Sequence, residues 1–231
     1  MSAPAPLVVG PGVRWLGAQR DVLGGDLRGH VDLAALAGAG SVWGLGPLEG
    51  VRGEVSIFGG EPSIARVERD AVVVTHGWKA RACFLVWAQV PRWEERTRAH
   101  AAGDRAALDL ASLEREVVAF ARTVGLDTER PLPFRAEGTA AALTLHVLDK
   151  RDDLPHDPER HERAKVRISL EARAVELVGF YSRHHRGVFT PREADVHVHI
   201  RTGDGRISGH LEAITLEPGA RLSVPASGFH Q

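Results

Sequence analysis

The chain has little of what stabilises secreted proteins or anchors membrane proteins. Its single cysteine, Cys83, excludes an intrachain disulfide and is compatible with a reducing cytoplasm. No uninterrupted apolar stretch is long enough to cross a bilayer, and the first residues lack the charged and apolar regions of a secretory signal. We therefore expect a cytoplasmic protein that has no membrane partner.

Neither sign of charge is in excess. The 29 basic and 30 acidic side chains give a formal net charge of −1 with histidine neutral, so no electrostatic attraction to nucleic acid is expected. Hydrophobic residues make up 43% of the 231 residues, which suffice for one large or two small domains. This is the composition of a soluble globular protein.

Short apolar segments bounded by glycine and proline predict a chain that is mostly β. One long helix is expected at residues 106–124, where Leu113, Val117 and Phe120 recur at three- and four-residue steps. Residues 93–105 are charged and are expected to form a solvated loop or helix. The polar residues 149–162 should form an exposed loop. Strands are predicted at residues 53–58, 63–68, 71–75, 82–90, 132–137, 139–148, 166–171, 174–181 and 220–224. Residues 132–148 are either two strands or one long bent strand, and residues 166–171 and 174–181 are expected to form a hairpin.

These elements indicate an α+β fold with mixed, largely antiparallel sheets in two similar-sized lobes and few helices. The first lobe, residues 1–125, is expected to be rich in strands and to end in the long helix. The second, residues 126–231, is expected to be a β lobe that carries a histidine site.

A hairpin is predicted within that second lobe. Residues 194–203 alternate β-branched and polar side chains, and residues 206–214 do so more loosely. Asp204-Gly205 between them is a strong signal for a two-residue turn. Such a turn fixes the register of the two strands.

The predicted register brings three histidines together. Counting back from the turn sets His199 opposite His210 and His197 opposite Glu212. All four side chains then project from one face, with paired Cβ atoms about 4.5–5.5 Å apart. Three converging imidazoles are typical of a catalytic metal site, and Glu212 is a candidate ligand or a group that orients an imidazole. A solvated His-x-His pair is the competing interpretation in a chain with 12 histidines, but it does not predict a third histidine at the matching register.

Three separated segments resemble the α-acetolactate decarboxylase family. Residues 43–60, WGLGPLEGVRGEVSIFGG, are similar to the family's Gly-x-Gly segment followed by a Gly-Glu strand and a glycine turn. Residues 133–138, PFRAEG, are similar to its arginine-bearing strand that ends in an acidic residue and glycine. The third segment is His197-x-His199 followed after ten residues by His210, in the family's spacing. The three occur in the family's order and extend over most of residues 43–216.

The resemblance implies a zinc-dependent carboxy-lyase of acetoin biosynthesis that acts on 2-acetolactate or a related 2-hydroxy-3-keto acid. His197, His199 and His210 would hold the metal, whose Lewis acidity takes up the electrons released as carbon dioxide leaves, giving a metal-stabilised enediolate and then acetoin. Three imidazoles also accept other divalent transition metals.

The resemblance also assigns two further residues. Arg135 matches an arginine whose guanidinium suits the substrate carboxylate. Glu54 matches the glutamate that protonates the enediolate. A homodimer is a further property that the resemblance suggests.

The chain departs from the family at three places. The family has another active-site glutamate in a C-terminal extension, and this sequence ends at Gln231 before that position. A threonine seven residues before the family's N-terminal glutamate is Pro47 here, which removes a hydroxyl and a backbone donor. Residues 187–196, before the histidine strand, number about three more than in the family. The metal ligands are therefore retained, while the proton-donor side of the site is altered.

Two other interpretations remain open. The chain would be a non-catalytic, metal-containing small-molecule binding protein of the same fold if Glu54 or Arg135 faced away from the metal. A cupin-type oxygenase also uses a His-x-His strand on a β scaffold, but residues 201–205 lack the glutamate that cupins place after that pair.

Overall fold

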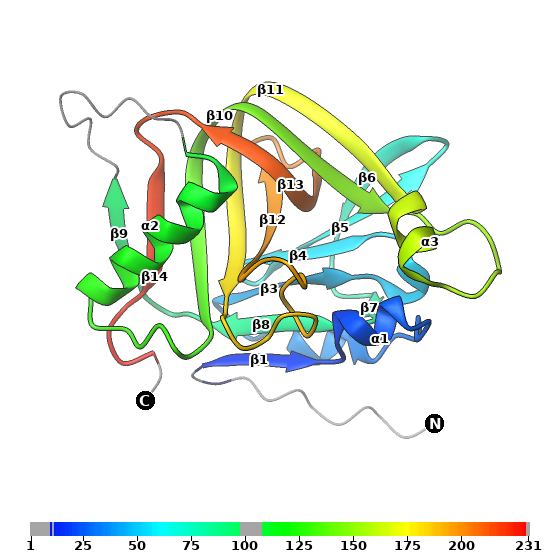
Figure 1. The fold of residues 1–231 in the computed structure, drawn as a ribbon, viewed down its shortest axis with the longest axis horizontal. Helices are drawn as coiled ribbons and strands as arrows, with labels where there is room; N and C mark the ends of the chain where they lie inside the picture. Colours follow the sequence, from blue (N-terminus) through cyan, green and yellow to red (C-terminus); the bar gives the residue numbers. More distant parts are fainter. Residues whose placement is uncertain (1–9, 11, 98–107, 230–231) are drawn as a thin grey trace.

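Two six-stranded sheets make up the body of the computed structural model, which describes residue 10, residues 12–97 and residues 108–229 (Figure 1). All pairings between the named strands of this part of the chain are antiparallel. With few helices beside them, the sheets give the α+β fold that the sequence predicts.

The first sheet has the strand order β1-β8-β3-β4-β5-β6. Its strand β3 includes the glycine-rich residues 44–47, which the sequence pattern does not assign to a strand. A Cβ on Gly46 would lie 2.2 Å from the carbonyl oxygen of Phe84, so only glycine lets β3 and β8 approach this closely. The strands are β1 (Val13–Leu16), β3 (Val42–Pro47), β4 (Glu54–Phe58), β5 (Glu61–Glu68), β6 (Ala71–His76) and β8 (Leu85–Gln89).

The second sheet has the order β11-β12-β13-β10-β14-β9, and β10 also pairs with β11. Strands β10 to β13 therefore form a closed ring. The long β10–β11 ribbon arches over the molecule in Figure 1, with β12 on the second half of β11 and β13 on the second half of β10. The strands are β9 (Trp93–Thr97), β10 (Leu132–Leu148), β11 (Lys165–Tyr181), β12 (Val196–Thr202), β13 (Ser208–Leu216) and β14 (Arg221–Pro225).

Several predicted elements differ in the structure. Residues 166–171 and 174–181 do not form a hairpin, because both segments pair with the continuous strand β10 and so belong to one strand, β11. The predicted strand 82–90 is divided between β7 (Arg81–Ala82), which pairs with β2 (Val31–Asp32), and β8. The predicted loop 149–162 contains most of α3 (Pro158–Arg163), whose first turn is capped by the Asp157 carboxylate.

The helices are few and short. Helix α2 (Leu110–Thr123) begins later than predicted, after Asp109 accepts a hydrogen bond from the backbone N–H of Ser112 at 2.7 Å. Its apolar stripe is buried as expected and faces the second sheet beside β14 (Figure 1). Most of the predicted segment 93–105 lies outside the described residues, and its first five residues form β9. The remaining elements are α1 (Gln19–Leu23) and the 3₁₀ turns Leu33–Leu36 and Glu49–Val51.

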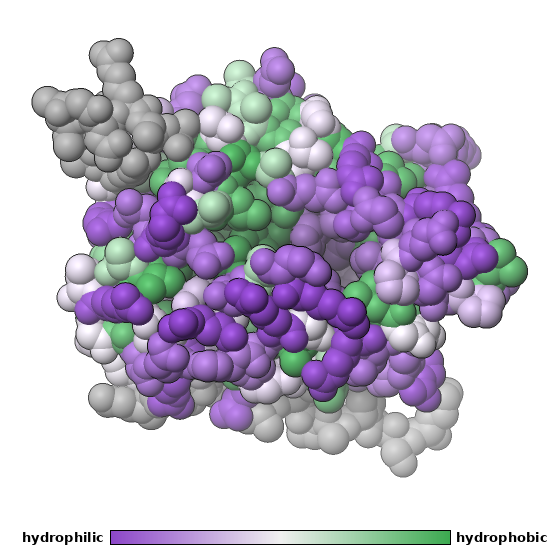
Figure 2. Space-filling view, viewed as in Figure 1, coloured by the Kyte–Doolittle hydropathy of each residue, from purple (hydrophilic) through white to green (hydrophobic). Residues whose placement is uncertain are grey.

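One hydrophobic cluster joins the facing sides of both sheets and α2, from Val22 to Phe229. Figure 2 shows mainly hydrophilic side chains over one face of the molecule, with hydrophobic ones gathered in a hollow near its centre. Within the described residues, no helix has both the length and the apolar character needed to span a bilayer.

Candidate metal centre

The hairpin between β12 and β13 has the predicted register near its turn, from Arg201 paired with Ser208 to His199 paired with His210. Asp204 and Gly205 occupy the turn, where Gly205 has the left-handed φ of 70° and the Thr202 hydroxyl donates a hydrogen bond to the Asp204 carboxylate at 2.6 Å. His199 pairs directly with His210. The local turn chemistry thus fixes the relative position of these two imidazoles.

The three predicted histidines converge. One ring nitrogen from each of His197, His199 and His210 lies within 4.8 Å of the others. Nε2 of His197 is 3.0 Å from Nδ1 of His210. His197 and His199 are buried, and His210 is half-buried. This compactness suits a single ion bound by three nitrogens at about 2.0–2.1 Å.

The outer nitrogens of two rings are held by neighbouring groups. Nδ1 of His197 donates a hydrogen bond to the carbonyl oxygen of Phe189 at 2.7 Å, so its Nε2 carries a lone pair toward the centre. Nδ1 of His199 lies 3.0 Å from the Ser56 hydroxyl, which accepts a hydrogen bond from Ser208 at 3.2 Å. Such outer contacts orient metal-binding imidazoles.

The inner nitrogens fit a divalent cation. Nε2 of His199 is buried and has no hydrogen-bond partner among the described residues, which is costly for a polar atom unless a ligand satisfies it. Burial lowers the pKa of His197 to about 4 and lowers the pKa values of His199 and His210 well below the usual histidine value. All three rings are therefore neutral at pH 7, as metal ligation requires.

Glu54, at the start of β4, lies beside the histidines as the sequence predicts. Its side chain is 2% exposed, and Oε2 is 3.8 Å from Nε2 of His199. Burial raises the pKa of Glu54 well above the usual glutamate value, because the surrounding apolar atoms disfavour the charged form. Burial therefore favours the protonated form of this carboxyl group next to the centre.

A cavity of about 330 Å³ opens onto this group of residues. It contains both an apolar wall and several titratable side chains, which is the usual composition of a small-molecule site. It is lined by Gln19, Val22, Leu23, Pro47, Glu54, Phe84, His146, Leu148, Pro158, His161, Lys165, Pro191, Arg192, Glu193, His197 and His210. We call it the histidine pocket.

Glu212 does not lie beside His197 as the register count predicts. Its carboxylate contacts Nε of Arg167 at 2.7 Å and Nδ1 of His146 at 3.0 Å, with Nζ of Lys165 at 3.6 Å. The His146 contact and then Arg167 lower the pKa of Glu212 to about 2. Glu212 is therefore an ionised partner of these side chains, at one remove from the three ligands.

The reason is a β-bulge in β13. Leu145 of β10 pairs with Leu211, whereas the preceding Thr144 pairs with Ala213. Glu212 is the extra residue between these pairs, and an extra residue redirects its own side chain. The hairpin turn cannot reveal this, because the bulge arises against β10.

Arg135 is not among the residues that line the histidine pocket. Its guanidinium lies 5.5 Å from the ring centroid of Trp43 and 5.6 Å from that of Trp93, and it pairs with the carboxylates of Glu95 and Glu137. Arg135 lies on the first half of β10, beside β14, whereas the pocket adjoins the second half. Arg135 therefore packs against these two tryptophan rings and forms ion pairs there, away from the histidine pocket.

The structure also reveals a neighbour that the sequence does not predict. His146 on β10 pairs with His210 across the ring of strands, and their imidazoles stack with centroids 4.5 Å apart. The pairing of β10 with β13 is the only signal that would have found His146, and it joins segments more than sixty residues apart.

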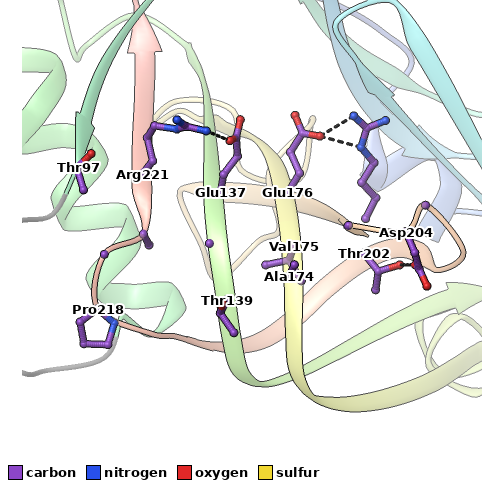
Figure 3. Close-up of a pocket in the computed structure, with 16 residues that line it drawn as sticks. Thr97, Glu137, Thr139, Ala174, Val175, Glu176, Thr202, Asp204, Pro218 and Arg221 are labelled. Atoms are coloured by element: carbon purple, nitrogen blue, oxygen red, sulfur yellow. Dashed lines mark hydrogen bonds and ion pairs between the residues drawn. The ribbon is translucent and has the colours of Figure 1, made fainter.

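A larger, more open cavity lies elsewhere, lined in part by Glu137, Glu176, Asp204, Arg201 and Arg221. Figure 3 shows Arg221 turned toward Glu137. Arg201 and Glu176 form a second ion pair, with Nη2 of Arg201 2.6 Å from Oε2 of Glu176. Asp204 lies 4.0 Å from Arg206 and accepts the Thr202 hydroxyl. Every charged side chain that lines this cavity therefore has a partner of opposite charge.

The fold and the site together define an α+β protein with three clustered histidines able to hold a metal. No family model and no curated protein sequence matches the chain. Several solved structures, however, are similar to the fold of this chain. Acetolactate decarboxylase from Bacillus subtilis strain 168 aligns with a TM-score of 0.73 at 14% identity, over 95% of this chain and 91% of that chain.

Two further structures agree with this likeness. Acetolactate decarboxylase from Bacillus subtilis subspecies spizizenii gives a TM-score of 0.73 at 14% identity, over 93% of this chain and 85% of that chain. A Staphylococcus aureus protein of unknown function, described as similar to alpha-acetolactate decarboxylase, gives a TM-score of 0.72 at 13% identity, over 92% of this chain and 84% of that chain. The protein therefore has the acetolactate decarboxylase fold that the sequence resemblance predicts.

Proposed function

We propose that the protein is a metal-dependent carboxy-lyase that converts 2-acetolactate, or a related 2-hydroxy-3-keto acid, into acetoin or its homologue and carbon dioxide. The observation that supports this most directly is the convergence of three neutral imidazoles beside the buried Glu54 carboxyl, whose pKa is raised, at the histidine pocket that Glu54, His197 and His210 line. The likeness of the fold to acetolactate decarboxylases supports the choice of reaction.

His197, His199 and His210 would hold the metal, with zinc as the leading candidate among divalent transition metals. A bound divalent cation supplies a Lewis acid that polarises the keto and hydroxyl oxygens of the substrate and so accepts electron density from the breaking carbon–carbon bond. The protein contributes the ring orientations, through Phe189 and Ser56, and an apolar wall that restricts water.

Glu54 would complete the reaction. Loss of carbon dioxide leaves an electron pair on the former carboxyl-bearing carbon, and that carbon must gain a proton. Burial raises the pKa of the Glu54 carboxyl, which favours its protonated form, and Oε2 already lies at the edge of the centre. After transfer, the carboxylate regains a proton from water that enters through the pocket.

Elemental analysis of the purified protein, combined with an acetoin assay on racemic 2-acetolactate, tests the proposal. About one equivalent of transition metal per chain and metal-dependent acetoin formation are expected. Metal without acetoin would reject the reaction but keep the site. If no metal is present and none binds on addition of zinc, manganese or cobalt, both are rejected.

A non-catalytic metal-containing binding protein is the second candidate. One observation favours it: Arg135 packs against two tryptophan rings and does not line the pocket. This candidate predicts that the metal-loaded protein binds small 2-hydroxy acids but releases no carbon dioxide from 2-acetolactate.

A further inference from the structure

An anionic substrate in the histidine pocket would be stabilised by a cationic side chain. The charged side chains that line the pocket differ in whether they already form ion pairs with the protein. Apart from the histidines, its charged lining residues are Glu54, Lys165, Arg192 and Glu193. Two of these are cations. Which of them is available to a ligand depends on the partners that each already has.

Lys165 already has partners. Its ammonium lies 2.8 Å from Oε2 of Glu162 and 3.6 Å from Oε1 of Glu212, and its side chain is 19% exposed. A substrate carboxylate at Lys165 would become a third anion around one ammonium group. Like charges in a partly buried site repel one another, so this position is unfavourable for a further anion.

His161 does not supply a charge either. Its Nδ1 lies 3.1 Å from Nε2 of His156, and the two rings pack edge to face with centroids 5.3 Å apart. Burial lowers the pKa of His161 to about 3, so the ring is neutral at pH 7.

Arg192 differs from both. It lines the pocket, its side chain is exposed, and it forms no ion pair with any residue in the described part of the chain. A guanidinium is always charged and can bind both oxygens of a carboxylate at once. It is therefore the cation at this pocket that is free to bind a carboxylate.

The backbone holds Arg192 near the pocket. Three residues earlier, the Phe189 carbonyl accepts the hydrogen bond from His197, and three residues later the Asp195 carbonyl accepts one from the N–H of Ser182 at 2.7 Å. Only residues 190–194 separate these two fixed carbonyls. Arg192 therefore cannot move far from the three histidines unless one of these two hydrogen bonds breaks.

We propose that Arg192 binds the carboxylate of the substrate at the mouth of the histidine pocket, an inference that rests on the proposed function. The keto and hydroxyl oxygens of the substrate would then face the histidines, and the carboxylate would face the mouth. The carbon–carbon bond that breaks would lie between them. Carbon dioxide would leave toward solvent, while Glu54 protonates the carbon that remains inside.

Steady-state kinetics on the metal-loaded protein test this assignment. Arg192→Gln should raise KM for 2-acetolactate about tenfold or more, because a charged hydrogen bond to the carboxylate is lost, with the metal content unchanged. Arg192→Lys should restore part of the affinity. Glu193→Gln removes a negative charge that would repel the substrate carboxylate at the mouth of the pocket, so it should lower KM. Arg183→Gln is the matched control, since Arg183 is on the same loop but pairs with Glu129 and does not line the pocket.

A binding measurement separates this proposal from the reaction. The probe is 2-hydroxyisobutyrate, which keeps the hydroxyl and carboxylate of acetolactate but has no keto group. Calorimetric titration should show weaker binding to Arg192→Gln than to wild type, even if wild type forms no acetoin. In that case the reaction fails and the carboxylate site stands. Equal binding to both proteins, or an unchanged KM together with a raised KM in Lys165→Gln, would overturn the assignment. Absence of 2-hydroxyisobutyrate binding to wild type would overturn it too.

Discussion

The imidazole of His146 stacks on that of His210 at a centroid distance of 4.5 Å and an interplanar angle of 26°, while its Nδ1 lies 3.0 Å from the Glu212 carboxylate. His146, which is not one of the three proposed ligands, thus packs against the ring of His210. The ionised Glu212 carboxylate lies against the edge of the His146 ring, and the stacked His146 ring covers one face of His210.

His146 therefore contributes to metal affinity by packing. His146→Ala should weaken zinc binding about 2- to 10-fold, because a stacked aromatic pair is lost. His146→Phe keeps the stacking surface and should bind zinc nearly as tightly as wild type. Competition with a chromogenic chelator measures both constants. If His146→Phe binds zinc as weakly as His146→Ala, the polar contact with Glu212 is what matters and the packing explanation fails.

Ser56 should also support the centre. Ser56→Ala removes the hydroxyl next to Nδ1 of His199 and should weaken zinc binding about 10- to 100-fold, the range found for groups that orient metal ligands. Ser63→Ala is the control, since Ser63 pairs with Ser56 across β4 and β5, is equally buried and has no hydrogen-bond partner among the described residues. Similar losses in both variants would point to packing of the sheet rather than to ligand orientation.

Glu54 should be needed for turnover but not for metal binding. Glu54→Gln keeps the size of the side chain and removes the acidic proton, so kcat should fall about 10²- to 10⁴-fold with the metal content unchanged. Glu68→Gln, an exposed change on the neighbouring strand β5, is the control. An active Glu54→Gln protein would show that another group supplies the proton.

The buried carboxyl of Glu54 should make stability depend on pH. Its pKa is higher in the folded protein than the usual value of 4.5, so the folded state retains the proton more strongly than the unfolded state. The stability associated with this proton is fully present below about pH 4.5 and is lost as pH rises through the folded-state pKa. Urea unfolding of metal-free protein between pH 4 and pH 8 should therefore show Glu54→Gln gaining stability relative to wild type as pH rises. A constant difference would mean that Glu54 is hydrated when the metal is absent.

Local signals predict the histidine centre better than they predict its surroundings. The Asp204-Gly205 signal predicts that His199 pairs with His210, and the structure has this pair, although the loop that joins the strands is longer than the predicted two-residue turn, with the Thr202 N–H donating to the Ile207 carbonyl at 2.9 Å. The direction of the Glu212 side chain depends on the bulge in the pairing of β13 with β10. The contacts of Arg135 depend on tryptophans from two other segments of the chain. Long-range strand pairing decides both, and no short stretch of sequence encodes it.

The same limit explains the secondary structure. Residues 165–181 contain two apolar runs that resemble a hairpin, yet they form one strand because β10 offers a continuous partner of equal length. Conversely, residues 44–47 look like a loop but form part of the buried strand β3, where the absence of side chains at its glycines permits close strand contact.

The bulge at Glu212 has a consequence for the charge of a loaded centre. With this carboxylate turned toward His146 and Arg167, the donor set from β12 and β13 is three neutral rings, so a bound divalent ion keeps its full charge of +2. A carboxylate ligand would lower that charge to +1 and occupy a coordination position. One inserted residue in a strand thus preserves the electron-withdrawing strength of the ion and leaves room beside it for two oxygen atoms of a ligand.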